Sequence, residues 1–489
     1  MKKVFVSLLI LFLFLLTISF SEVDTMPPKV SIVNLKNGQT VSGVITIQVN
    51  ASDNVGVAKV EFYIDNRKVG EDDESPYEFE WNTLYYPNKV YNLAVIAYDE
   101  SGNKSAVRIN IIVNNTAPIN VWQKTFGGTD EDGANSIQQT SDGGYIVAGY
   151  TYSFGAGWSD VYILKLDENG NLLWQKTFGG SSDDEANSIQ QTSDGGYIVA
   201  GYTYSFGAGG DVYILKLDAD GNLVWKKTFG GSSDDEANSI QQTSDGGYIV
   251  AGYTSSFGAG GRDVYILKLD ANGNLVWQKT FGGSGWDEAY SIQQTSDSGY
   301  IVAGYTESFG DSDEDVYILK IDENGELVWE KIFGGKYYDV VSSIQQTSDG
   351  GYIVAGYTKS FGAGGRDVYI LKLDANGELV WQKTFGGWGG DEARSIQQTS
   401  DGGYIVAGYT TSFGARGSDV YILKLDANGE LVWQKNFGGD SSDGAFAIQQ
   451  TSDGGYIVAG NTESFGAGKS DVYILKLDAD GNTGPYPTK

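Results

Sequence analysis

Short runs of alternating apolar and polar residues fill most of the chain, and in its larger part they return with a fixed period. Within one period, the alternation predicts strands at residues 172–178, 187–192, 196–203 and 211–218. The phrase TSDGGYIVAGYT at residues 140–151 recurs nearly unchanged in six further periods. Its Ser-Asp-Gly segment and a later Asn-Gly segment predict tight hairpin turns, because glycine reaches positive φ without steric cost. The pattern therefore predicts a repeated unit built from four strands.

A tryptophan marks the same place in every period, and successive tryptophans are 51 or 52 residues apart. These residues are Trp122, Trp174, Trp225, Trp277, Trp329, Trp381 and Trp433. A period of this length with strand patterns alone is typical of propeller blades. The place of an eighth tryptophan holds Pro485, which cannot continue a ladder of strands. Because residues 121–126 precede every other blade element, the strands balance only if this segment completes the last blade, which predicts a closed seven-bladed β-propeller over residues 119–483.

A different pattern occupies residues 27–116, with the apolar runs KVSIVNL, GVITIQVNA, AKVEFYID, YEFEWNT, YNLAVIAY and VRINIIVN between turn-rich pieces. About seven short strands in a segment of this size are typical of a β-sandwich. The stretches PPKVSIVNLKNGQTVSG, ASDNVGVAKVEFYIDNRKVGEDDESPYEFEWNT and AYDESGN resemble the bacterial Ig-like domain that is often appended to exported proteins. The resemblance implies an N-terminal Ig-like domain that acts as a spacer, with Trp81 in its core.

The first residues of the chain have the organisation of a secretory signal. Lys2 and Lys3 precede the apolar run VFVSLLILFLFLLTISF, and Ser19 and Ser21 are small residues at the −3 and −1 positions of a cleavage site. This arrangement predicts a signal peptide at residues 1–21, and an uncleaved membrane anchor is the alternative. We therefore expect a protein that is secreted or held at the cell surface or in the periplasm.

Two family resemblances support the propeller. The repeat WQKTFGGSSDDEANSIQQTSDGGYIVAGYTYSFGAGGDVYILKLDADGNLV resembles the secreted bacterial and archaeal β-propeller repeats of the SBBP type, over residues 121–482. The spacing D-x-x-G-x-x-x-W from Asp167 to Trp174 is similar to the tryptophan-docking motif of quinoprotein-like propellers, with Asn169 in place of the usual Thr. Most members of both families are binding or scaffold modules, which the resemblance implies here as well. The departure at Asn169 gives no support for a quinone, and we predict no cofactor.

Composition and charge exclude several classes of function. The chain has 33 Lys and Arg against 63 Asp and Glu, a formal net charge of −30, which opposes binding to nucleic acid or to anionic membrane surfaces. It has no histidine, which excludes a Ser-His-Asp triad and histidine-ligated metal sites. It has no cysteine, so packing alone must stabilise the exported protein. Carboxylate, lysine, tyrosine and hard-cation chemistry remain.

One Asp recurs just before the innermost predicted strand of every blade, at Asp132, Asp184, Asp235, Asp287, Asp339, Asp391 and Asp443. Seven carboxylates near the mouth of one channel could hold a cation. The alternative is that each Asp caps local backbone amides, as Asp often does in turns. We favour capping, because a residue that repeats with the fold is expected to serve the fold. We therefore predict no metal site.

Differences among the seven copies gather in one set of loops. Because strands alternate in direction, the loop before the innermost strand and the loop joining the second strand to the third lie on one face, called here the variable face. Both tight turns lie on the opposite face, the turn face. The turns hardly change, whereas the loops before the innermost strand read TDEDG, SSDDE, SSDDE, SGWDE, KYYDV, WGGDE and DSSDG. On the variable face we expect exposed ligand-binding residues that stack on sugars or dock a protein: Trp286, Tyr290, Tyr337, Tyr338, Trp388 and Arg394.

The resulting expectation is an exported, monomeric, non-catalytic protein that binds an extracellular or envelope polysaccharide or protein through the variable face. Two alternatives stay open. One is a carboxylate-dependent glycosidase or lyase on the same propeller, although no paired-acid site can be named from the sequence. The other is a purely architectural protein of the cell envelope, in which the aromatic residues of the variable face reflect drift among the copies.

Overall fold

The computed structural model describes residues 24–83, 86–115, 120–311 and 314–487, and every regular element in these ranges is a β-strand. The prediction of an all-β protein is confirmed. No helix long and apolar enough to cross a membrane occurs in the described part of the chain. The predicted signal peptide, residues 1–21, lies outside the described residues. The chain divides into two compact units, Met1–Pro118 and Ile119–Lys489.

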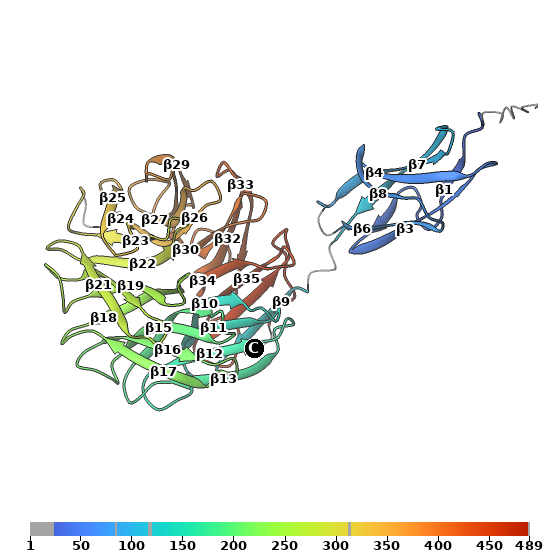
Figure 1. Cartoon of the computed structure of the whole chain (residues 1–489). Coiled ribbons are helices and arrows are strands. Elements are labelled where there is room, and N and C mark those ends of the chain that lie inside the picture. The colour runs from blue at the N-terminus through green and yellow to red at the C-terminus, as the bar shows by residue number, and fades with distance from the viewer. Residues whose placement is uncertain (1–23, 84–85, 116–119, 312–313, 488–489) are drawn as a thin grey trace, which may run out of the picture. The chain divides into compact units, whose positions relative to one another are not determined.

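The N-terminal unit is a pair of sheets around one core (Figure 1). One sheet has the order β1-β3-β6 and the other the order β2-β8-β7-β4-β5. Trp81 is buried between them, as predicted, with edge contacts to Tyr86 and Tyr91. The strands are β1 (Lys29–Ile32), β2 (Gln39–Val41), β3 (Val44–Ser52), β4 (Val57–Ile64), β5 (Arg67–Asp72), β6 (Tyr77–Asn82), β7 (Lys89–Asp99) and β8 (Lys104–Val113).

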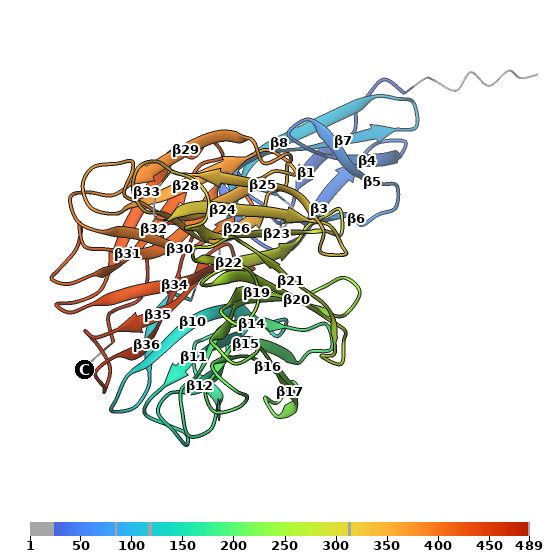
Figure 2. The same cartoon turned by 90° about the vertical axis from the view of Figure 1, so that its left-hand side faces the viewer.

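The C-terminal unit consists of seven four-stranded antiparallel sheets, or blades, arranged about a central channel (Figures 1 and 2). From the channel outwards, the first three blades contain β10 (Asp132–Gln139), β11 (Tyr145–Thr151), β12 (Asp160–Leu166) and β13 (Leu172–Phe178); β14 (Asp184–Gln191), β15 (Tyr197–Thr203), β16 (Asp211–Leu217) and β17 (Leu223–Phe229); β18 (Asp235–Gln242), β19 (Tyr248–Thr254), β20 (Asp263–Leu269) and β21 (Leu275–Phe281).

The next three blades contain β22 (Asp287–Gln294), β23 (Tyr300–Thr306), β24 (Asp315–Ile321) and β25 (Leu327–Phe333); β26 (Asp339–Gln346), β27 (Tyr352–Thr358), β28 (Asp367–Leu373) and β29 (Leu379–Phe385); β30 (Asp391–Gln398), β31 (Tyr404–Thr410), β32 (Asp419–Leu425) and β33 (Leu431–Phe437). The seventh contains β34 (Asp443–Gln450), β35 (Tyr456–Thr462), β36 (Asp471–Leu477) and β9 (Trp122–Phe126).

The seventh sheet contains strands from both ends of the C-terminal unit. β9 pairs antiparallel with β36, and the register runs from Val472 opposite Phe126 to Lys476 opposite Trp122. In Figure 1 the red strands of this blade accordingly lie beside the green-blue β10. The outer edge of the last three strands is therefore paired with the strand that begins the unit.

The middle strands of each blade are buried on both sides because every blade stands between two others. All seven residues of β12 are buried, and Ile146 and Ile163 of the first blade pack with Val199 and Leu215 of the second. Burial on both sides demands continuous apolar runs, which explains the sequences YIVA and DVYIL. The core is therefore a series of seams between blades.

Tryptophan docking tightens each seam at the outer edge. A Cβ atom placed on Gly170 of the first blade would lie 2.7 Å from the ring of Trp122 in the seventh, and Gly221 meets Trp174 in the same way. Both glycines also have positive φ, so no other residue fits these two requirements equally well. The predicted docking arrangement is present in spite of Asn169.

The innermost strands begin earlier than the alternation predicted. β14 starts at Asp184 rather than at residue 187, because Asp184 and Glu185 pair with Thr203 and Tyr202 of β15 although both are charged. The register then shifts between Ala186 and Ser188, which is a β-bulge. The recurring Asp therefore stands as the first residue of the strand and not in the loop before it.

Candidate functional site

The exposed aromatic side chains of the variable face are the first feature of the site. Of the residues predicted to bind a ligand, Trp388 is 90% exposed, Tyr337 54% and Trp286 49%. The guanidinium of Arg262 lies 5.0 Å from the centre of the Trp286 ring and 4.1 Å from the centre of the Tyr253 ring. These cation–π contacts hold the Trp286 ring in place while one part of it stays open to solvent.

Trp158 is a further exposed aromatic residue of this face, 71% exposed, which the sequence reasoning missed. It lies in the loop between β11 and β12 and, with Tyr152, lines a cavity of about 590 Å³. Asp130, Glu131, Gly157 and Lys469 complete the lining. The sequence contains a signal for this residue, because the other six copies have no Trp in the loop between the second and third strands.

Tyr290 and Tyr338 differ from the expectation, because they are not freely exposed. Both pack against a small cluster of Tyr305, Val340 and Tyr357, and the rings of Tyr290 and Tyr305 stack with centroids 6.0 Å apart. Burial raises the pKa of Tyr290, and the neighbouring carboxylate of Glu288 raises it further. These tyrosines therefore shape the wall between the fourth and fifth blades.

The place of Tyr290 in the fold explains its burial. It is the bulge residue of β22, since the register shifts between Ala289 and Ser291. In the first three blades this position holds an asparagine, and Asn135 and Asn187 each donate a hydrogen bond of 3.0 Å to the carbonyl of the next blade, at Ala186 and Ala237. The fourth to seventh blades hold Tyr290, Ser342, Arg394 and Phe446 there instead. The channel wall is thus regular on one side and varied on the other.

Arg394 is paired rather than free. Its Nη2 donates to Glu392 Oε2 at 2.8 Å, and its guanidinium lies 5.6 Å from the centre of the Tyr409 ring. Glu392 is almost completely buried and also receives a hydrogen bond from Arg366. A buried carboxylate needs such partners, because removing a charge from water costs several kcal/mol.

A similar ion pair joins Glu288 of the fourth blade, which is 4% exposed, to Arg262 of the third. Glu288, Glu392, Arg262 and Arg366 were not predicted as site residues. The sequence does single out the two arginines, because the residue just before the third strand of a blade is Arg in only the third and fifth copies. Together they place fixed positive and negative charges beside the aromatic rings.

Glu185 and Glu236 hold the corresponding positions in the second and third blades. Burial raises the pKa of Glu185 above its usual value, although hydrogen bonds with Tyr202 and Ser159 lower it in part. Burial likewise raises the pKa of Glu236, against a hydrogen bond with Tyr253 and the charge of Arg262. These two half-buried carboxyl groups are therefore easier to protonate than ordinary glutamates.

The ring of seven aspartates has the capping role that we favoured. Asp184 is fully buried, and its Oδ2 accepts hydrogen bonds from Gly180 N–H at 2.8 Å and Ser205 Oγ at 2.6 Å. Its Oδ1 accepts a hydrogen bond from Thr203 Oγ1. The carboxylate thus satisfies the backbone and hydroxyl donors of its own blade, and these bonds explain why the residue repeats.

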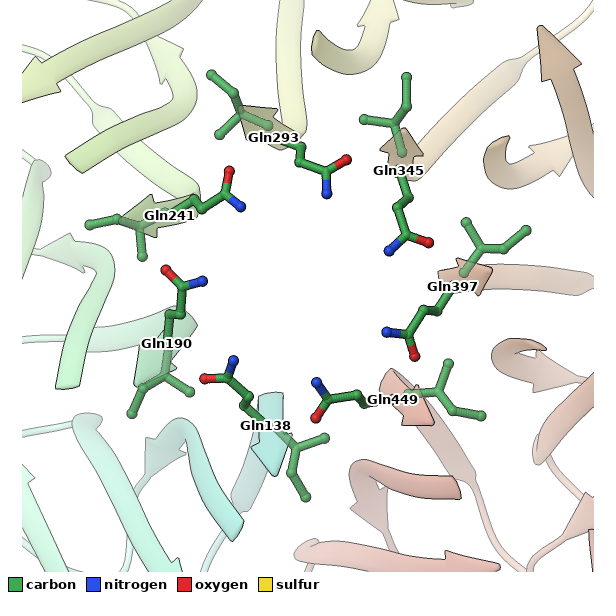
Figure 3. A pocket seen from close by; sticks show the side chains of 14 residues that line it. Gln138, Gln190, Gln241, Gln293, Gln345, Gln397 and Gln449 are labelled. Carbon is green, nitrogen blue, oxygen red and sulfur yellow. The ribbon is translucent and has the colours of Figure 1, made fainter. Parts of the chain in front are cut away.

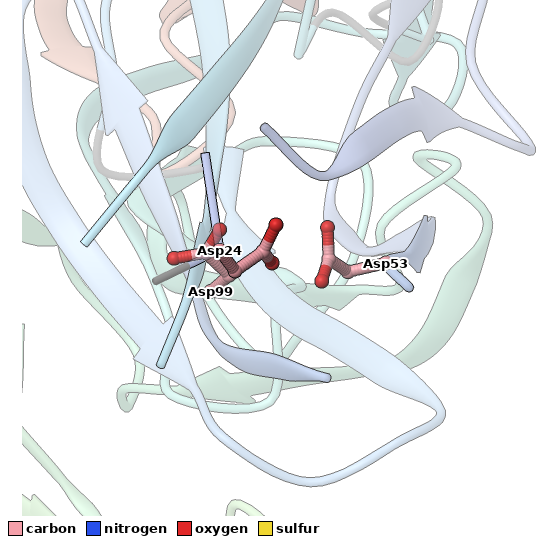
Figure 4. A group of neighbouring side chains, drawn as sticks. All are labelled: Asp24, Asp53 and Asp99. Atoms are coloured by element: carbon pink, nitrogen blue, oxygen red, sulfur yellow. The ribbon is translucent and has the colours of Figure 1, made fainter. Parts of the chain in front are cut away.

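Three carboxylates of the N-terminal unit come close to one another (Figure 4). One oxygen each of Asp24, Asp53 and Asp99 lies within 4.8 Å of the others, a spacing that could hold a cation. Asp53 accepts the N–H of Val55 at 2.9 Å, and Asp99 accepts the N–H of Asn103 at 2.8 Å. These bonds close the two loops and account for the position of both side chains without an ion.

Family comparisons agree with the two units. The family model described as bacterial Ig domain matches residues 28–95. The model described as outer membrane protein assembly factor BamB matches residues 159–335 and 209–477, and the longer match covers more than half of the chain. The chain belongs to this β-propeller family. Within the BamB-family propeller, a model for a β-propeller domain of unknown function also matches residues 140–172. The finer resemblance to SBBP-type repeats stays a prediction.

The chain is similar at low identity to one curated protein and to several solved structures. Regulatory protein FlaEY of Caulobacter vibrioides is 24% identical over 371 residues, which are 67% of this chain and 35% of that protein. This chain therefore spans about a third of the length of that relative. The fibronectin(III)-like modules of Clostridium thermocellum CbhA are 28% identical, covering 18% of this chain and 99% of that chain, with a TM-score of 0.16. The β-propeller domain of the Trilobed protease from Pyrococcus furiosus is 11% identical, covering 73% and 98%, with a TM-score of 0.39.

Proposed function

We propose that this protein is a non-catalytic carbohydrate-binding protein of the cell exterior or envelope, and that its ligand lies on the variable face. One observation carries the proposal: Trp158, Trp286 and Trp388 are exposed on this face. Trp158 shares its cavity with Asp130, Glu131 and Lys469, and Arg262 lies over the ring of Trp286. Exposed indole rings stack on the apolar face of a sugar, while charged groups hydrogen-bond its hydroxyls.

Several further features support the proposal. The names of the matched family and of the distant relative describe an assembly factor and a regulatory protein. The Ig-like domain and the propeller are consistent with an extracellular or envelope location. The pairing of β9 with β36 supports a closed ring of seven SBBP-type blades, which would present the variable loops as one rigid surface.

The test is a glycan array followed by calorimetric titration of the best hit. The variant W158A/W286A/W388A should lose binding by at least tenfold, because stacking of each ring contributes about 1 kcal/mol or more. The control V276A/V328A/V380A removes three apolar side chains of the outer strands that are 58–60% exposed. Both variants should melt close to the parent protein, since exposed substitutions usually change stability by less than about 0.5 kcal/mol. Binding by the tryptophan variant at parental affinity would instead favour a protein ligand or an architectural role.

The glycosidase or lyase alternative now has named residues. Glu185 and Glu236 occupy equivalent places in neighbouring blades, and burial raises the pKa of both, a condition that suits a general acid. Incubation with a panel of polysaccharides would detect this activity as reducing-sugar release or as unsaturated products. Activity that disappears in E185Q would replace the binding proposal with the catalytic one.

A further inference from the structure

The central channel contains a second feature, which lies near the end of each innermost strand that is distant from the variable face. Near the end of every innermost strand, one glutamine points towards the channel axis (Figure 3). With the preceding isoleucines, these glutamines line a cavity of about 260 Å³. The seven residues, called here the glutamine ring, are Gln138, Gln190, Gln241, Gln293, Gln345, Gln397 and Gln449.

The hydrogen bonds between blades fix the orientation of each amide. Gln190 Oε1 accepts the backbone N–H of Gln242 in the next blade at 2.6 Å, and the same bond recurs at all seven seams. The last of them joins Gln449 to Gln139, across the seam between the seventh and first blades. Because only the carbonyl oxygen of an amide can accept a hydrogen bond, the nitrogen must occupy the other position.

All seven amide nitrogens therefore point into the channel, as Figure 3 shows. No hydrogen bond from these nitrogens to another described residue is present, whereas the carbonyl oxygens are all occupied. The ring thus offers N–H donors from seven directions, and each of its carbonyl oxygens already accepts a hydrogen bond from the next blade. Converging amide dipoles of this kind create a positive potential that suits an anion.

The charges nearest in the sequence do not oppose an anion at this place. The aspartate of each Ser-Asp-Gly turn follows the glutamine ring by four residues, and Asp194 is paired with Lys216 at 2.9 Å. The equivalent aspartate is paired with a lysine in all seven blades. Each of these aspartate–lysine pairs is neutral, so the formal charge of −30 comes mainly from other parts of the chain. Salt screens the effect of such charges on the channel over about 10 Å.

We propose that the glutamine ring is a binding site for one small inorganic oxyanion, such as phosphate or sulfate. The oxygens of a tetrahedral oxyanion accept hydrogen bonds in several directions at once, which matches donors arranged around an axis. The bound anion would link the seven innermost strands through the glutamine amides, whose orientation is already fixed by the hydrogen bonds between blades. This site is independent of the ligand proposed for the variable face.

The first experiment is calorimetric titration of the full chain with sodium phosphate and, separately, with sodium sulfate. A saturable heat for one anion per chain is expected. The variant Q293E/Q345E/Q397E keeps an oxygen that accepts the N–H of the next blade but turns three donors into carboxylate oxygens. Its affinity should fall by at least tenfold, because each lost charge-assisted bond and each repulsion weakens the site.

The control Q278E/Q382E/Q434E adds the same charge on the outer strands. Its design follows the chain itself, since the fourth blade holds Glu330 at this position, where the carboxylate accepts the Tyr317 hydroxyl at 2.8 Å. The control should bind phosphate like the parent. Equal loss in both variants, or no saturable heat with either anion, would overturn the proposal.

A second measurement does not depend on a variant that folds. Crystals of the parent protein soaked in selenate should show an anomalous difference peak on the channel axis, within hydrogen-bond distance of the glutamine nitrogens. A channel that contains only water in such crystals would also overturn the proposal.

Discussion

At the residue scale, the repeated phrase is explained by hydrogen bonds that each blade makes with both neighbours. In IQQTSDGG, the first glutamine accepts a backbone N–H from the next blade and the second accepts one from the previous blade, as Gln242 Oε1 does from Ser193 N–H at 2.8 Å. The Asp of the turn binds the Lys of the third strand, as in Asp194 with Lys216. Both glutamines and the Asp of the phrase therefore have structural partners, which explains why they recur in the seven copies.

The glycine of the Ser-Asp-Gly turn gives a prediction for a single residue. Gly195 has φ of 84° and open space around its α-carbon, so only backbone strain would oppose a side chain. Gly195→Val should destabilise the protein by about 1–3 kcal/mol, because a β-branched residue is strained at positive φ. Urea unfolding of the variant measures this loss, and the ligand affinity of the variable face should not change.

The fourth blade allows the reverse substitution at the equivalent position of its turn. There Ser298 holds the same place at φ of 71°. Ser298→Gly should stabilise the protein by about 0.5–1 kcal/mol, since relief of the strain exceeds the entropic cost of glycine. Equal unfolding free energies for Gly195→Val and the parent protein would show that the turn adapts, contrary to this reasoning.

At the scale of the strands, each blade contains carboxylates in two kinds of surroundings. Asp211, at the start of β16, is buried beside Asp235 of the next blade. Burial raises the pKa of Asp211, the N–H of Ala208 lowers it in part, and the charge of Asp235 raises it again. Asp194, on the turn face, has the opposite balance: burial raises its pKa, but hydrogen bonds from Thr192 and Lys216 outweigh burial and leave it at about 2.

The two kinds of carboxylate predict a stability maximum in mild acid. A raised pKa means that the folded state binds a proton more readily, so stability should increase as the pH falls from neutral towards about 4. Asp194 contributes stability above its unfolded pKa of about 4, and this contribution is lost as the pH falls towards about 2. Melting temperatures across this range should therefore rise and then fall.

The variant D211N/D263N/D367N isolates the first effect. Its amides still accept the backbone N–H bonds but cannot titrate, so the rise in melting temperature between neutral and mildly acidic pH should become smaller than in the parent protein. A rise of unchanged size would assign the effect to the general loss of negative charge instead.

Strand positions were largely predictable, whereas the site was only partly so. Period and turn residues located the strands because hairpin chemistry is local, and β13 matches its predicted bounds of 172–178. The bulge at Tyr290 was not predictable from alternation, since a bulge depends on pairing with β23. For the same reason Tyr290 was expected to be exposed, and the partners Glu288 and Arg262 were missed. Trp388 and Trp286 were predicted exposed because isolated aromatics in polar loops have no core to join.

At the scale of the whole molecule, we expect the pairing of the first strand of the C-terminal unit with its last strand to stabilise the propeller. β9 supplies the outer strand of the seventh blade, and Trp122 docks on Gly170 of the first. Gln123 adds a hydrogen bond from its Nε2 to the carbonyl of Gly484 at 2.7 Å. A short segment near the N-terminus of the unit thus contacts both the last blade and the first.

Two truncations that differ by only this segment test its role. A chain that lacks residues 1–128 loses β9 together with the Ig-like unit, which exposes the edge of β36 and removes a buried tryptophan. We expect a loss of at least about 3 kcal/mol of stability, or aggregation, because removing a buried tryptophan side chain alone costs that much. A chain that lacks only residues 1–115 keeps β9 and should melt with the propeller transition of the full chain. Scanning calorimetry compares the melting temperatures of the two truncated chains. Equal melting temperatures would show that the propeller does not need its first strand. The seams between neighbouring blades would then stabilise the array even with one seam weakened.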